Sequence, residues 1–94
     1  MGHGRNDGLS RQDGGMSWIS DMSSRIAASA GIDASELTID ATEAEELLRL
    51  AGVAAHTSGD RTNAPLLCHV LGRAVALGAP LDSLARVVDD AAGG

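Results

Sequence analysis

The chain is poor in large side chains: its 94 residues include one tryptophan, Trp18, and neither phenylalanine nor tyrosine. Its interior must therefore be built from leucine, isoleucine, valine, methionine and alanine, whose contacts are smaller than those of aromatic rings. A chain this short leaves a large share of its surface exposed, so its margin of stability is thin. Because small domains often gain stability by self-association, we expect a homodimer.

Lysine is absent too, so the seven cations are all arginines, set against thirteen acidic residues and a net charge of −6. Nucleic-acid binding requires a clustered basic footprint, whereas these arginines are spread along the chain. No basic amphipathic face suited to a lipid surface is present. The apolar runs are far shorter than the roughly 20 residues of a membrane span. We therefore expect no nucleic-acid partner and no membrane partner.

The single cysteine, Cys68, leaves no internal disulfide to form. The N-terminal segment lacks the apolar centre of a secretory signal, so a cytoplasmic location is expected. Residues 1–15 contain five glycines and few apolar side chains beyond Leu9. Such a segment cannot bury enough surface to offset the entropy of ordering it. The sequence therefore predicts a disordered tail over residues 1–15 and one helical domain over residues 16–94.

Apolar residues recur at helical spacing, and no segment alternates as a strand does. Ser17 and Thr42 are expected to cap the first two helices, Thr42 as part of a capping box with Glu45. Asn63 is expected to cap the third, and Gly78 to end it. The prediction is an all-α fold, a compact bundle of four helices. Their expected ranges are about 17–30, 42–57, 64–77 and 80–92.

The third of these helices is apolar nearly all round, because between Leu66 and Leu77 only His69 and Arg73 are strongly polar. Such a helix is typical of the centre of a fold. Gly72 within it would allow a neighbouring helix to approach closely. We therefore expect this helix to be the hub around which the others pack.

A short connector, residues 32–40, separates the first two helices. Its apolar residues are too few and too irregular for a long element. A single helical turn over residues 33–37 is possible. We expect Leu37 and Ile39 to insert into the core.

The polar loop before the third helix is the most distinctive part of the chain. One interpretation is that Arg61 and the helix N-terminus bind an anion or a partner protein. The other is purely structural: a turn at Ser58 to Asp60, a cap, and an ion pair between Arg61 and Asp60 or an acid of the preceding helix. The loop contains no Walker-type phosphate motif, which favours the structural interpretation. The candidate surface residues are His56, Asp60, Arg61, Asn63 and Pro65.

Trp18 joins this candidate surface as a separate case. The sole aromatic residue either packs into the end of the bundle or stays partly exposed as an anchor of an interface. Core packing is the favoured interpretation.

Metal binding and catalysis find little support in the sequence. His56, Cys68 and His69 match no zinc pattern, and adjacent residues point about 100° apart on a helix. The same geometry opposes a Cys68–His69 nucleophile, and apolar surroundings should raise the pKa of Cys68. The acids near Glu43 fit the start of a helix. We predict no metal, no cofactor and no enzymatic activity.

Several residues together resemble a known family. These are Trp18, the run Ala54-Ala55-His56, Arg61, the run Asn63-Ala64-Pro65-Leu66, and Gly72. Over residues 16–92 the chain resembles DUF6457, a family of small actinobacterial helical domains of unknown function. Members occur alone or appended to molybdopterin-guanine dinucleotide biosynthesis nucleotidyltransferases, which attach GMP to molybdopterin. The resemblance implies an accessory role in molybdenum-cofactor biosynthesis, with His56, Arg61, Asn63 and Pro65 on the contact surface.

The leading hypothesis is a non-catalytic interaction domain that associates with itself or docks on a cofactor-biosynthesis protein through residues 56–65. The alternative is a small-ligand carrier in which Arg61 and the helix end at Asn63 hold an anionic or phosphorylated metabolite. A small-molecule ligand is the less expected of the two, and an autonomous enzyme ranks last.

Overall fold

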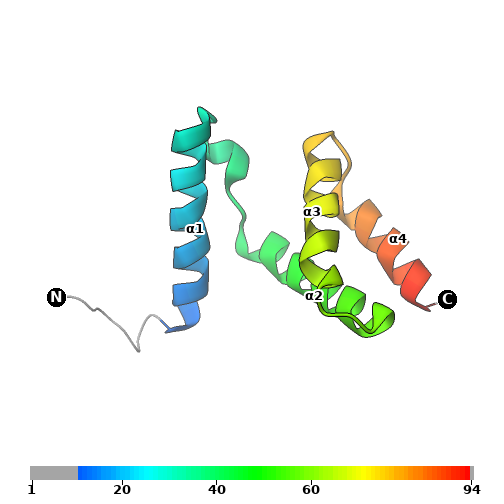
Figure 1. Ribbon diagram of the computed structural model, residues 1–94. Helices are drawn as coiled ribbons and strands as arrows, with labels where there is room; N and C mark the ends of the chain where they lie inside the picture. Colours follow the sequence, from blue (N-terminus) through cyan, green and yellow to red (C-terminus); the bar gives the residue numbers. More distant parts are fainter. Residues whose placement is uncertain (1–10, 94) are drawn as a thin grey trace. The chain divides into compact units, whose positions relative to one another are not determined.

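Helices account for most of residues 11–93, the part of the chain that the computed structural model describes. The α-helices are α1 (Arg11–Ala30), α2 (Ala41–Ser58), α3 (Asn63–Ala76) and α4 (Leu81–Gly93). A 3-10 turn, η1 (Ala34–Leu37), lies between α1 and α2 (Figure 1). No strand occurs in these residues, so the predicted all-α fold with four helices is confirmed. The chain divides into two compact units, one ending at Ala41 and the other beginning at Thr42.

In the first unit, α1 begins at Arg11 rather than at the expected Ser17. Once a helix has formed, each added residue gains a hydrogen bond, and no proline precedes Ser17 to stop the extension. Residues 1–10 of the predicted disordered tail lie outside the described residues. The other end of α1 is as predicted, because Gly31 has a φ of 71° and the Ile32 N–H donates to the Ala27 carbonyl at 2.9 Å.

The connector contains the helical turn that the sequence allowed. Asp33 begins η1 by accepting a hydrogen bond from the Ser35 backbone N–H at 3.0 Å. This bond, followed by one from the Ser35 hydroxyl, lowers the pKa of Asp33. η1 packs against α1, and Ala27 of α1 is buried. Leu37 and Ile39 are half-buried, so they are only partly withdrawn from solvent.

The second unit contains α2, α3 and α4, and its core is small. Leu50, Leu71 and Ala85 supply one buried side chain from each helix. Partly buried residues pack around these three: Leu47, Leu67, Leu81, Leu84 and Val88. Because α3 has only two neighbouring helices in this unit, they cover only one side of it.

The expectation that α3 is a buried hub is therefore wrong. Leu71 is buried, but Leu66 and Val70 are 60% and 59% exposed. Gly72 is exposed as well, and no atom lies within 4 Å of the position that a Cβ would take there. Near-uniform apolarity thus marks a helix with one packed face and one uncovered face, not a central helix.

Two expected N-caps are also wrong. α2 begins at Ala41, so Thr42 lies inside the helix instead of capping it. At α3 the N-cap is Thr62 and not Asn63, and the Thr62 side chain makes no capping hydrogen bond. The predicted end of α3 is confirmed, since Gly78 has a φ of 108° and its N–H donates to the Val75 carbonyl at 2.9 Å. None of the helices in residues 11–93 combines the length and apolarity that crossing a bilayer requires.

Candidate functional site

The loop between α2 and α3 is organised by Asp60. Its carboxylate accepts hydrogen bonds from the Thr62 backbone N–H at 2.9 Å and from the Thr62 hydroxyl at 2.7 Å. The hydroxyl bond and then the backbone bond lower the pKa of Asp60. An aspartate that binds the backbone two residues ahead forms a local turn. This turn sets where α3 starts, and it explains why Thr62 takes the cap position instead of Asn63.

The first two N–H groups of α3 are already hydrogen-bonded to the preceding loop. The Asn63 N–H donates to the Asp60 carbonyl and the Ala64 N–H to the Arg61 carbonyl, both at 3.1 Å. Pro65 follows and has no N–H. Anion binding at a helix N-terminus depends on unsatisfied N–H groups, and here the loop already satisfies those of Asn63 and Ala64.

A second set of bonds ties the end of α2 to the start of α3. The Asn63 side-chain amide donates to the Ser58 hydroxyl at 3.0 Å, and that hydroxyl also accepts from the Asp60 N–H at 3.2 Å. Gly59 makes the bend possible with a φ of 75°, a region that other residues adopt at a cost. The structure therefore brings Asp60 and Asn63 together in one network, as turn-forming residues.

The remaining loop residues predicted for the surface are exposed. Arg61 takes part in no ion pair within residues 11–93, so its expected pairing with Asp60 or a helix acid is wrong. The acid beside it is engaged by Thr62. His56 lies in the last turn of α2, where an imidazole suits the negative end of the helix dipole. His56 and Pro65 are both exposed.

Sequence reasoning missed an apolar groove of about 490 Å³ in the second unit. We call it the α2–α4 groove, since all three helices of the unit contribute to it. Its lining is Val53, Ala54, Thr57 and Ser58 from α2, Asn63, Leu66, Leu67 and Val70 from α3, and Val87, Val88, Ala91 and Ala92 from α4.

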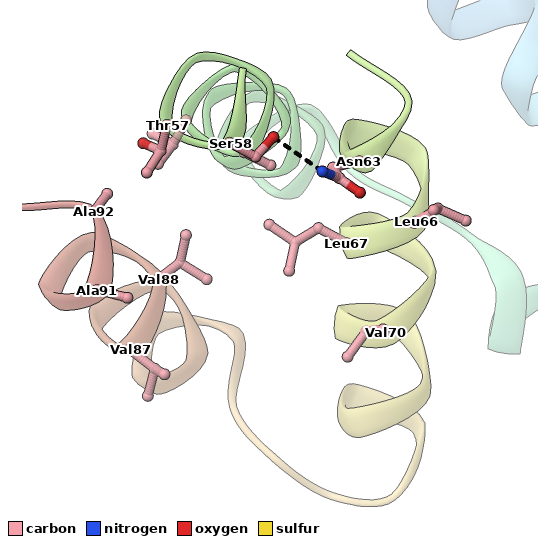
Figure 2. A pocket seen from close by; sticks show the side chains of 12 residues that line it. Thr57, Ser58, Asn63, Leu66, Leu67, Val70, Val87, Val88, Ala91 and Ala92 are labelled. Carbon is pink, nitrogen blue, oxygen red and sulfur yellow. Dashed lines mark hydrogen bonds between the residues drawn. The ribbon is translucent and has the colours of Figure 1, made fainter. Parts of the chain in front are cut away.

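The floor and rim of this groove differ in exposure. Leu67 and Val88 are partly buried, pack against the core and face the groove from α3 and α4 (Figure 2). The rim residues Leu66, Val70 and Val87 are strongly exposed, Val87 at 66%. At one end lie Ser58 and Asn63, whose side chains hydrogen-bond to each other. The groove therefore offers apolar contact and almost no available hydrogen-bonding group.

A signal for the groove was present in the sequence. Leu66 and Val70 are four residues apart on α3, which places them on one face, and Leu67 and Leu71 form a second apolar row beside them. A core of three buried residues needs only one of these rows. The other row, Leu66 and Val70, suggests a helix buried on all sides, but a helix with one uncovered apolar face has the same pattern.

Trp18 does not pack as favoured. In the first unit it is 62% exposed, and Ile26 on the same helix is exposed too. The interpretation as a core residue is thus wrong for this unit. Its place on the candidate surface stays a prediction.

Cys68 follows the sequence interpretation more closely. It is partly buried, its thiol lies 3.8 Å from the Leu47 carbonyl oxygen, and burial raises its pKa. Within residues 11–93 no three His, Cys, Asp or Glu side chains are grouped closely enough to hold a metal ion.

Comparison of the chain with models of protein families, with curated proteins and with solved structures found no match. The resemblance to DUF6457 accordingly stays a prediction.

Proposed function

We propose that the chain is a non-catalytic interaction domain that binds the apolar surface of a protein through the α2–α4 groove. The observation that carries the proposal is the exposure of Leu66, Val70 and Val87 along an apolar groove. Contiguous exposed apolar surface on a small domain is typical of a protein-binding site. A groove between helices is suited to the apolar face of a partner helix.

The chemistry of the groove favours a protein over a small molecule. Small-ligand sites of this volume place a few polar groups so that they converge on the ligand and orient it. Here the Asn63 side-chain amide donates to the Ser58 hydroxyl, and the rest of the lining is almost entirely apolar. Contacts of this kind reward area and shape rather than hydrogen-bonding pattern, as the core of a protein interface does.

The alternative, an anionic-metabolite carrier using residues 56–65, has weaker support. Arg61 is exposed and unpaired within the described residues, which leaves one cation for such a ligand. Against this, the N–H groups of Asn63 and Ala64 are already bonded. The Asp60 carboxylate also places a negative charge at the same helix end. An incoming anion would meet that charge without gaining the usual helix-terminus donors.

The family resemblance adds a biological context to the proposal. Under it, the partner surface belongs to molybdenum-cofactor biosynthesis, such as a nucleotidyltransferase that attaches GMP to molybdopterin. The groove supplies the contact and the partner supplies the chemistry. Residues 56–65 adjoin the groove through Ser58 and Asn63, so the loop and the groove form one candidate surface.

Affinity capture with matched variants tests the proposal. Tagged wild type, Val70→Asp and Leu48→Asp would each be used to retain proteins from the native lysate. Leu48 is 73% exposed on α2 and does not line the groove, so it controls for adding a charge to an exposed apolar position. We expect a protein, either another copy of the chain or a different one, to be retained by wild type and Leu48→Asp and lost with Val70→Asp. Equal retention by all three would contradict the proposal.

A further inference from the structure

We draw no further inference here: the strongest candidate, the exposed apolar rim that Leu66, Val70 and Val87 form along the α2–α4 groove, belongs to the site already described, and nothing in the structure shows what covers it.

Discussion

Arg49 and Asp89, forty positions apart in the sequence, form a two-pronged ion pair that joins α2 to α4. The Arg49 Nη1 lies 3.0 Å from Asp89 Oδ1, and Nη2 lies 2.9 Å from Asp89 Oδ2. The same guanidinium also binds both oxygens of Glu46, at 3.1 and 2.9 Å. Planar two-pronged contacts of this kind fix orientation as well as contributing energy. The triad therefore links α4 to α2 by a contact between residues far apart in the sequence.

The triad gives stability a defined dependence on pH. Hydrogen bonds from Arg49 hold the pKa values of Glu46 and Asp89 below their ordinary values of 4.5 and 3.8. Because the folded values are the lower ones, the stabilisation is present above the ordinary values and is lost as pH falls through the folded ones. We expect Arg49→Gln to lower the urea midpoint near neutral pH. The difference from wild type should shrink in acid and in high salt. A constant difference across the whole acid range would contradict this account.

The same substitution should destabilise the protein strongly at Leu50 and hardly at all at Leu48. Leu50 is fully buried in the core of the second unit, whereas Leu48 is exposed. Leu50→Ala should lower the free energy of unfolding by about 2–5 kcal/mol, through lost burial and the cavity left behind. Leu48→Ala should change it by about 0.5 kcal/mol or less. Urea titration followed by circular dichroism measures both, and equal effects would show that the core is misplaced.

Alanine substitutions at Gly59 and Gly72 should change stability in opposite directions, because only Gly59 has a strained backbone conformation. Gly59 has a φ of 75° with open space at its Cβ position, so Gly59→Ala should destabilise by about 1 kcal/mol through strain alone. Gly59→Asn should cost less, because asparagine tolerates this region better. Gly72 lies inside α3 with equally open space, so Gly72→Ala should stabilise by about 0.5–1 kcal/mol. Thermal unfolding of the three variants is the measurement. A destabilising Gly72→Ala would indicate a close contact on that side of α3.

Anions should not raise the thermal stability of the protein by binding at the N-terminus of α3. Millimolar inorganic phosphate or GMP should leave the thermal midpoint of the wild type unchanged, because the Asn63 and Ala64 N–H groups are already bonded. Differential scanning calorimetry would measure the midpoint, with chloride at equal ionic strength as the reference. A stabilisation that Arg61→Ala abolishes would favour the carrier hypothesis instead.

How far the sequence predicts this structure depends on the range of the interaction. Helix positions and the ends at Gly31 and Gly78 follow from apolar spacing and glycine, which are local signals. The sequence predicts the cap of α3 at Asn63, one residue later than the observed cap at Thr62. Asp60 and Asn63 are both good turn formers, and the hydrogen bond from Thr62 to Asp60 decides between them. Rules based on local sequence do not distinguish well between two neighbouring residues that can both form a turn or a cap.

The groove and the triad depend on neighbours distant in the sequence. A helix that is apolar on two faces reads as buried, and only the number of helices packed around it shows that one face is open. For α3 that number is two within its unit. The pairing of Arg49 with Asp89 has no local signature, since both residues fit equally well on solvated helix faces.

The central claim is that another protein surface covers the exposed row of α3, and thiol accessibility tests it most directly. In a Cys68→Ala background, Val70→Cys and Leu48→Cys would be alkylated in concentrated purified protein, after dilution, and in the native lysate. The account predicts that the thiol at position 70 reacts several-fold more slowly than the one at position 48 when the partner is present, and that the two rates converge on dilution. Equal rates under all three conditions would contradict it.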